Sequence, residues 1–472
     1  QNSAGDTVTL TAGTGANVVI PNGGIRMVAT DGGGSGAAVT DVLDVLGGTG
    51  NVGLGSGAFG TGLTTGTDNV AIGEAAGDAL TTGSDNTLVG DNAGGALTTG
   101  GSNVAIGSSA LLTEDGNGNN VAIGFEALKI QNAGAEAYNV AIGYQAGVAT
   151  TTGNANTLIG GVSGDAITTG ANNVGVGINS LGSLTTGDGN IAIGTAALDA
   201  QTTVSDNVAI GRGALGANTS GTNNTSVGSY SLDANTTGAS NTAFGKSALG
   251  ANTTGDSLTA FGKGALETNT TASNNTAIGA SALESNTTGS ENTALGKSAL
   301  LSNTTGTENV SLGLNSLDAN TTGSYNVAVG TSALGANTTA SNNTAVGTNA
   351  LVANTTGEVN SAFGASSLFT NTTGYGNTAV GKNALYTNNG NNNTAVGHEA
   401  LELNTTGTGN VAIGREALEA NTTGTANVAV GSSALEVNTT ASNNTAVGHS
   451  ALTANTTGAG NVGIGQNALS SN

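Results

Sequence analysis

The sequence contains no cysteine and no tryptophan, and only one proline and one methionine. Without cysteine, neither a disulfide framework nor a cysteine-based metal site is possible. Only 8% of the residues are charged and 3% are aromatic, whereas an average globular chain has about 25% charged residues. Low charge also argues against disorder, because disordered chains usually combine low hydrophobicity with high net charge. The composition therefore points away from both ordinary globular domains and an unfolded chain.

Basic residues are scarce. The chain has eight Lys and Arg against 30 Asp and Glu, which gives a formal net charge of −22. A nucleic-acid partner is not expected, since no basic stripe exists to neutralise phosphates, and an anionic membrane surface is disfavoured for the same reason. No apolar stretch approaches the roughly 20 residues of a membrane helix, so no membrane insertion is expected. We expect the acidity to keep a long assembly soluble.

Glycine is abundant, and much of it belongs to a repeat. We call the glycine that ends each Asn-x-Ala-aliphatic-Gly segment the anchor glycine. The 25 anchor glycines run from Gly55 to Gly465, and 21 of the 24 intervals between them are seventeen positions long. The intervals that end at Gly73 and Gly143 are slightly longer, and the one that ends at Gly397 is shorter by one. A fixed period of this kind is typical of a solenoid.

One repeat, starting at Asn343, reads N-T-A-V-G-x-x-A-L-x-x-N-T-T-G-x-x. Its length predicts two short strands, at 344–346 and 350–351, separated by two corners. Asparagine recurs at the positions of Asn343 and Asn354, four residues before and seven after the anchor glycine, with Leu258 in its place at one rung. We call these positions the first and second asparagine columns. Stacked amides can bond along the axis as ladders. Gly347 and Gly357 are expected to form turns that need left-handed backbone.

Apolar substitutions at two positions of the repeat predict the core. The residue before the anchor glycine is nearly always aliphatic or Phe, and the residue four after it is Leu in every later repeat. In three early repeats Gly takes this second position and an aliphatic follows three residues later, at Leu80, Leu97 and Ile167. The predicted core residues are therefore Val346, Phe244, Phe261 and Phe363 before the anchor glycine, and Leu249 and Leu351 after it.

These features predict an all-β fold, a parallel β-solenoid (β-roll or β-helix) of about 25 coils. Stacking at about 4.8 Å would give a length of roughly 120 Å. One aliphatic and one Leu per coil make a thin core, so we expect a homotrimer that shares burial between chains. The Ala two residues before the anchor glycine lies on the opposite strand face and is the predicted contact with a neighbouring chain. Residues 51–210 hold the less regular repeats and 211–472 the highly regular ones.

Residues 1–50 do not repeat and are predicted to be a β-rich cap or joining module. Strands are expected at 7–11, 18–20 and 25–29, and the segment 38–46 suits a strand or a short helix. The chain stops in mid-coil at Asn472, so we expect either a further segment or an abutting subunit there. If the predicted cap docks on that coil, the chain would polymerise end to end. Because residue 1 is Gln, we expect a secretion signal to have been removed upstream.

Several segments resemble known surface proteins. Asn69-Val-Ala-Ile-Gly73, Asn103-Val-Ala-Ile-Gly107 and Asn139-Val-Ala-Ile-Gly143 resemble the N-S-V-A-I-G element of trimeric autotransporter adhesin heads. The phrase A-L-x-x-N-T-T-G-x-x-N-T-A-V-G is similar to repeats in phage tail-fibre-type proteins. The resemblance covers about residues 51–472 and implies intertwined trimeric β-rolls that serve adhesion or host attachment. The adhesin repeat is shorter than the repeat of this chain, and the sequence shows no stalk, anchor or chaperone domain.

Candidate chemistry is sparse, and each candidate has a structural alternative. Acids recur four residues after a column of basic residues, which suggests a ligand-binding charged stripe or simply two solvent-facing columns; we favour the second, because exposed ion pairs contribute under about 1 kcal/mol. Carboxylate pairs such as Glu114 and Asp115 fit no calcium motif. The basic column is formed by Arg212, Lys246, Lys263, Lys297, Lys382, His398, Arg415 and His449, each directly after an anchor glycine.

Three other features leave alternatives open. Sequons such as the one at Asn252 match a glycosylation acceptor, although the turn explains them equally well. The six tyrosines are scattered but could form a carbohydrate- or receptor-binding surface. Stacked threonines raise ice binding as a distant possibility. No site for catalysis, a cofactor or a metal emerges from these patterns.

The sequence thus predicts a non-enzymatic structural or adhesive fibre subunit that forms a long rigid shaft, extracellular or at the cell surface. The alternative is a viral tail-fibre shaft for host attachment, on the virion surface. A lectin-like fibre is a third hypothesis, but no globular tip follows residue 50. Expected partners are further copies of the chain and possible host-cell or surface glycans.

Overall fold

The computed structural model describes residues 8–10, 18–20, 25–30, 39–45, 50–60 and 62–471. They belong to two compact units, Gln1–Thr225 and Ser226–Asn472. All regular structure in the described residues is β-strand, without a helix, which confirms the all-β prediction. Accordingly, the described part of the chain contains no helix of the length and apolarity needed to cross a membrane.

The first unit begins with antiparallel strands. β1 (Val8–Leu10) pairs with β2 (Val18–Ile20), and β3 (Ile25–Thr30) pairs with β4 (Val39–Val45). The segment that suited a strand or a short helix is therefore a strand. β4 also pairs antiparallel with β5 (Val52–Leu54), which is the first strand of the repeat. The rest of the predicted cap lies outside the described part.

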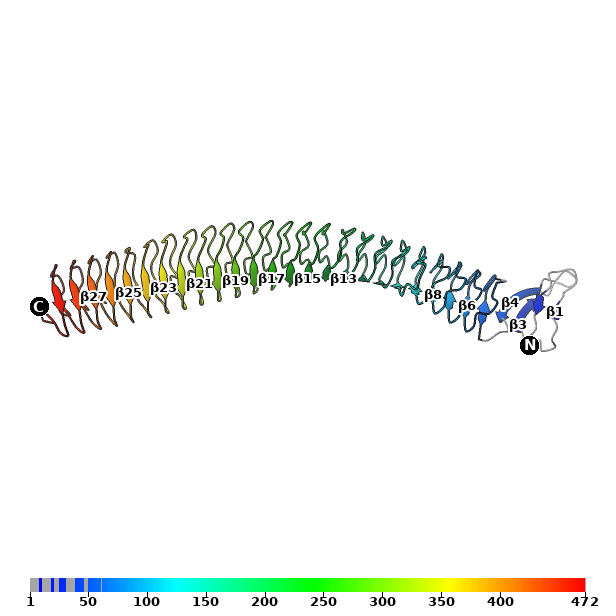
Figure 1. Ribbon diagram of the computed structural model, residues 1–472, viewed down its shortest axis with the longest axis horizontal. Helices are drawn as coiled ribbons and strands as arrows, with labels where there is room; N and C mark the ends of the chain where they lie inside the picture. Colours follow the sequence, from blue (N-terminus) through cyan, green and yellow to red (C-terminus); the bar gives the residue numbers. More distant parts are fainter. Residues whose placement is uncertain are drawn as a thin grey trace. The chain divides into compact units, whose positions relative to one another are not determined.

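From β5 onward each coil contributes one short strand, which Figure 1 draws as a series of arrows. In the first unit these are β6 (Val70–Ile72), β7 (Thr87–Val89), β8 (Val104–Ile106), β9 (Val121–Ile123), β10 (Val140–Ile142), β11 (Thr157–Ile159), β12 (Val174–Val176), β13 (Ile191–Ile193) and β14 (Val208–Ile210). β15 (Thr225–Val227) contains the boundary between the units.

The second unit contains β16 (Thr242–Phe244), β17 (Thr259–Phe261), β18 (Thr276–Ile278), β19 (Thr293–Leu295), β20 (Val310–Leu312), β21 (Val327–Val329), β22 (Thr344–Val346), β23 (Ser361–Phe363), β24 (Thr378–Val380), β25 (Thr394–Val396), β26 (Val411–Ile413), β27 (Val428–Val430), β28 (Thr445–Val447) and β29 (Val462–Ile464). Among the strands of the repeat within each unit, neighbours pair in parallel and in register, so that Ala243 lies opposite Ala260. The chain is a parallel β-solenoid of about 24 turns with a 17-residue repeat.

The second predicted strand of each coil does not form. The segment around Ala350 and Leu351 is a run of turns. Asn349 and Leu351 have φ angles of 57° and 50°, in the left-handed region, whereas a strand needs extended backbone with negative φ. The turns still bond between coils, because the Leu351 N–H donates to the Ser367 carbonyl at 2.9 Å.

The core is built from small residues and one leucine per coil. Ala345, two residues before the anchor glycine, is fully buried, as are Ala350 and Leu351. Leu249 is also fully buried, which confirms the two leucines of the predicted core. The alanine expected to contact a neighbouring chain therefore packs inside its own coil.

The other half of the core prediction is wrong. Phe244, Phe261 and Phe363 are 44%, 52% and 42% exposed, and Val346 is half-buried. Side chains alternate between the two faces of a strand, so the inward alanine forces the residue beside the anchor glycine outward. The inside of the coil has room for a methyl group at this point because the leucine already fills it.

The described asparagines of both columns are buried, except for Asn461 in the last coil, and hydrogen bonds between coils confirm the ladders. The second column is formed by asparagine from Asn218 onward. The Asn354 Nδ2 donates to the Asn337 Oδ1 at 3.0 Å and to the Gly357 carbonyl at 2.9 Å. The same carbonyl accepts a bond from the Asn343 Nδ2 at 2.9 Å. The two columns therefore meet at one backbone oxygen in each coil.

The two glycines of the repeat serve different needs. Gly347 has φ of 138°, a region that side chains rarely adopt. Gly357 does not have positive φ, contrary to expectation, but a Cβ there would lie 2.3 Å from the Gly374 carbonyl oxygen. Glycine at 357 thus allows close approach of the next coil rather than a left-handed turn.

Candidate functional site

The basic column predicted from the sequence lies on the surface, and all eight of its residues are exposed. Its observed ion pairs run to the adjacent residue of the same coil. The Arg415 Nη1 lies 2.7 Å from the Glu416 Oε1, and the His398 Nδ1 lies 3.1 Å from the Glu399 Oε2. These pairs are surface contacts of the kind that contributes little to stability.

The acidic column is half-buried rather than solvent-facing. It occupies the position five residues after the anchor glycine, beside the buried leucine. Burial disfavours the charged form and raises the pKa of several of its carboxyls. Those with raised pKa are Asp165, Asp199, Asp233, Asp318, Glu402 and Glu419. The contribution of these groups to the free energy of unfolding is fully present at pH values below the ordinary pKa of the carboxyl. It declines as the pH rises through the raised pKa of the folded state.

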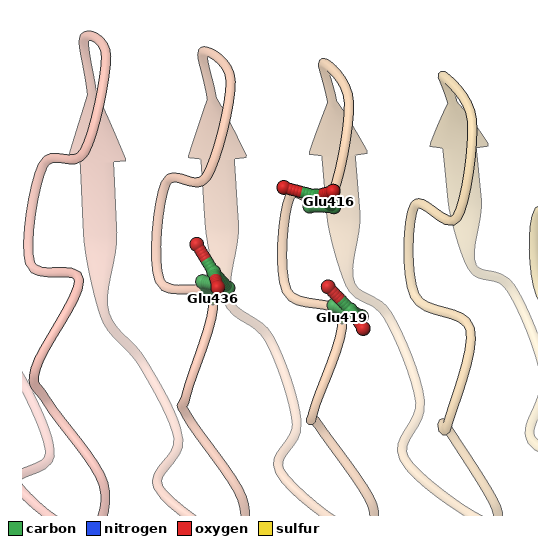
Figure 2. A group of neighbouring side chains, drawn as sticks. All are labelled: Glu416, Glu419 and Glu436. Atoms are coloured by element: carbon green, nitrogen blue, oxygen red, sulfur yellow. The ribbon is translucent and has the colours of Figure 1, made fainter.

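Three carboxylates gather in the second unit. Glu416 and Glu419 lie on one coil and Glu436 on the next (Figure 2), with one oxygen of each within 4.8 Å of the others. Oxygen donors at this separation suit a hard cation such as Ca²⁺. Arg415 and the Ser433 hydroxyl, which donates to the Glu416 Oε2 at 3.3 Å, already engage one of the three. Burial, followed by repulsion from Glu416, raises the pKa of Glu419.

A further carboxylate is buried in the first unit. Glu114 occupies the second asparagine column and is fully buried. Its Oε1 accepts bonds from the Asn117 N–H at 3.1 Å and the Asn117 Nδ2 at 2.8 Å, while its Oε2 has no hydrogen-bond partner. Burial is the main cause of its raised pKa. Glutamine occupies the same position in other coils, at Gln131 and Gln201.

We expect Glu114→Gln to stabilise the protein by about 1 kcal/mol at neutral pH, because it removes a buried charge that lacks a full set of partners. At low pH Glu114 is protonated in both the folded and the unfolded wild type. The difference in stability between wild type and variant should therefore appear only as the pH rises above 4.5, the ordinary pKa of a glutamate. Unfolding of both proteins by denaturant between about pH 4 and about pH 8 measures it. The exposed Glu74→Gln is the control; a stability difference for Glu114→Gln that is independent of pH would contradict the prediction.

Most of the aromatic residues are at least partly exposed, although Phe59 is fully buried, and they do not form one continuous surface. Phe125 stacks on Tyr144 with ring centroids 5.6 Å apart, and Phe369 stacks on Tyr386 at 4.8 Å. Phe244 and Phe261 stack at 4.9 Å on neighbouring strands. Stacking covers one face of each ring, which leaves less of it for a sugar.

The glycosylation sequons are turn elements in the folded chain. Asn252 is fully buried, and its Nδ2 donates to the Asn235 Oδ1 at 2.9 Å and to the Gly255 carbonyl at 3.1 Å. A glycan on this nitrogen would break both bonds and has no room in the folded coil. The folded protein is therefore not an acceptor at this asparagine.

One apolar surface consists of residues that the sequence predicts to lie in the core. We call the outward-pointing first and third residues of β16 to β29 the sheet face of the second unit. Its third residues are all Val, Ile, Leu or Phe, and its first residues are Thr, Ser or Val. None of these strands carries a charged residue. The absence of charge is visible in the sequence, but the outward direction of these apolar residues is not, because their hydrophobicity predicts them in the core.

In comparisons with known proteins, no family model, no curated protein and no solved structure matches the chain. The resemblance to adhesin heads and tail-fibre repeats thus stays an expectation. The described surface offers an uncharged apolar sheet face, an exposed basic column and a half-buried acidic column.

Proposed function

We propose that the chain forms the shaft of a structural or adhesive fibre outside the cell, without enzymatic activity and assembled as a homotrimer. The observation that carries this proposal is the uniformity of the coils. In the second unit nearly every coil repeats the same buried leucine and asparagines in register, with alanine or serine at the inward position of the strand. Such a repeat gives length and stiffness through nearest-neighbour stacking.

The variation between coils supports the same function. Interior positions of the second unit accept few substitutions. Where Ser311 replaces the inward alanine it remains paired, because its hydroxyl donates to the Ser316 carbonyl at 2.8 Å. The positions one and five residues after the anchor glycine differ freely in charge and size. A spacer needs a constant interior, whereas its outer positions can adapt to solvent and to partners.

The proposal is tested by finding the protein in its source. Antibodies against the full chain should label the outside of intact producing cells in immunogold electron microscopy, and external protease should remove the label. Label only in the interior of permeabilised cells would overturn an extracellular fibre. Label on purified virions and not on cells would replace it with the viral tail-fibre shaft.

A further inference from the structure

The sheet face of the second unit exposes much apolar surface. From β16 to β28, ten of its large apolar side chains are at least 37% exposed: Phe244, Phe261, Ile278, Leu295, Val310, Leu312, Phe363, Val380, Ile413 and Val447. A run of exposed apolar side chains of this kind on neighbouring strands is uncommon on a monomeric protein, where contiguous apolar patches larger than about a few hundred Å² mark interaction sites. A standard protein interface buries about 800 Å² per partner, so a stable contact would have to use many coils of the face.

The bulkiest part of this face is continuous. β16 to β20 pair in register, so that Phe244, Phe261, Ile278, Leu295 and Leu312 form one row of neighbours. Aromatic residues, Phe included, are enriched in protein interfaces. This row, at the β16 end of the face, is therefore the part of it that a contact is most expected to cover.

From these observations we infer that the sheet face of the second unit is the surface through which copies of this chain associate. The occupant must be uncharged and apolar where it meets the face, and it must extend along many coils. A second copy meets both needs with the same face. The net charge of −22 makes the other surfaces repel between copies, so association is favoured where charge is absent. The inference rests on the proposed function only in that a shaft of several chains needs such a face.

The charges at the two ends of the strands favour one arrangement. Exposed Lys246, Lys263 and Lys297 follow the C-terminal ends of strands in β16 to β20. Exposed acids precede the N-terminal ends in the same region: Asp256, Glu291 and Glu308. When two copies are related by a rotation about the stacking direction of the coils, the basic edge of one copy meets the acidic edge of the next. Equivalent coils of the two copies then lie at the same height along the stack. Copies stacked in opposite directions would instead place lysines against lysines.

A matched pair of substitutions tests the surface. Leu295, on the face, and Leu314, directly after an anchor glycine, are 42% and 47% exposed. Leu295→Lys should weaken association at least tenfold, because it places a charge in an apolar contact. Leu314→Lys should leave association unchanged, since lysine occurs naturally at its position. Sedimentation equilibrium of the full chain, with a monomer mass of 44.6 kDa, measures both.

Cysteine crosslinking tests the arrangement, and the natural chain adds no thiol of its own. Ile278→Cys should form a disulfide between copies under mild oxidation, because the same coils face each other. Ala280→Cys, exposed beside the face, should crosslink much less. Circular dichroism establishes that each variant is folded.

Each outcome decides the matter. A wild-type chain that sediments as a monomer overturns the inference, and so does equal dissociation by both lysine variants. If the wild type associates but the Ile278→Cys variant does not crosslink, the copies are not parallel with equivalent coils at the same height, and that arrangement is overturned. These results are independent of where the protein occurs, so failure here leaves the immunogold test of the fibre standing, and the reverse also holds.

Discussion

Replacing Gly160 by alanine is expected to destabilise the first unit by roughly 3–5 kcal/mol, whereas the same change at the adjacent Gly161 should be neutral or slightly stabilising. Gly160 is an anchor glycine with φ of 139°. A Cβ there would lie 2.4 Å from the Gly177 carbonyl oxygen and 2.6 Å from its carbon. Both atoms belong to the backbone of the next coil, which cannot move aside without breaking the ladder.

Gly161 has none of these constraints. Its φ is not in the left-handed region, and a Cβ would meet nothing within 4 Å. Side chains as large as arginine occupy the equivalent position in other coils, as at Arg212. Alanine there mainly reduces the freedom of the unfolded chain, which is worth about 0.4–1 kcal/mol.

Because coils contact only their neighbours, the damage at Gly160 should be local. Hydrogen exchange should show lost protection in β11 and β12, and less change several coils away. Denaturant unfolding of both variants gives the free energies, provided that the transitions are tested for two-state behaviour, from which long repeats can depart. Full protection of β11 and β12 in Gly160→Ala would contradict the assignment of the anchor glycine as obligatory.

Much of the fold could be predicted from the sequence because a repeat constrains the same positions many times. The period, the parallel stacking, the buried Leu351 and both asparagine columns follow from residue types that recur with few exchanges in the later repeats. Even the early departure was predictable: Leu80, Leu97 and Ile167 are fully buried, as their shifted pattern indicated. Asparagine ladders are a distinctive signal because few other environments bury an amide in every repeat.

Which face of the strand points into the core could not be predicted from alternation alone. Thr-Ala-Val points either its small or its large residues inward, and hydrophobicity favours the wrong choice. However, compensating changes in side-chain volume do indicate which residues point inward. Where the inward residue is Leu88, the usual core leucine is replaced by Gly94, and a Cβ at Gly94 would lie 2.9 Å from the Leu88 Cδ2. Such an exchange of volume occurs only between side chains that share a core.

The left-handed backbone conformation of Leu351 could not be predicted from the sequence pattern either. Leu351 has φ of 50°, a conformation that costs roughly 1–2 kcal/mol. Its full burial contributes about as much or more, so the coil tolerates the strained backbone. Propensity arguments assign such turns to Gly and Asn and therefore miss a position where packing decides. The same reasoning explains why the exposed sheet face, the main candidate surface, appeared only with the structure.

Removal of one ladder asparagine should have the next largest effect on the free energy of unfolding. The Asn309 Nδ2 donates to the Asn292 Oδ1 at 3.1 Å and to the Gly323 carbonyl at 2.9 Å. Its Oδ1 accepts bonds from the Asn326 N–H at 3.0 Å and the Asn326 Nδ2 at 3.2 Å. Asn309→Ala leaves these buried groups without partners and should cost about 2–4 kcal/mol, since each unmade bond carries a desolvation penalty.

The chain offers its own control for the number of bonds. Leu258 interrupts the first asparagine column and presents no side-chain oxygen to the next rung, Asn275. The side chain of Asn275 therefore has fewer bonds: its Nδ2 donates to the Gly289 carbonyl and its Oδ1 accepts from the Asn292 N–H, both at 2.8 Å. Both asparagines are fully buried, so their truncation leaves similar cavities.

Asn275→Ala is accordingly expected to cost about half as much as Asn309→Ala. Denaturant unfolding compares the two free energies, and hydrogen exchange at the Asn326 amide reports the local loss in Asn309→Ala. Equal costs would mean that the cavity, common to both, outweighs the hydrogen bonds. A larger loss at Asn309 would show that the amide ladder, rather than side-chain volume alone, binds each coil to the next.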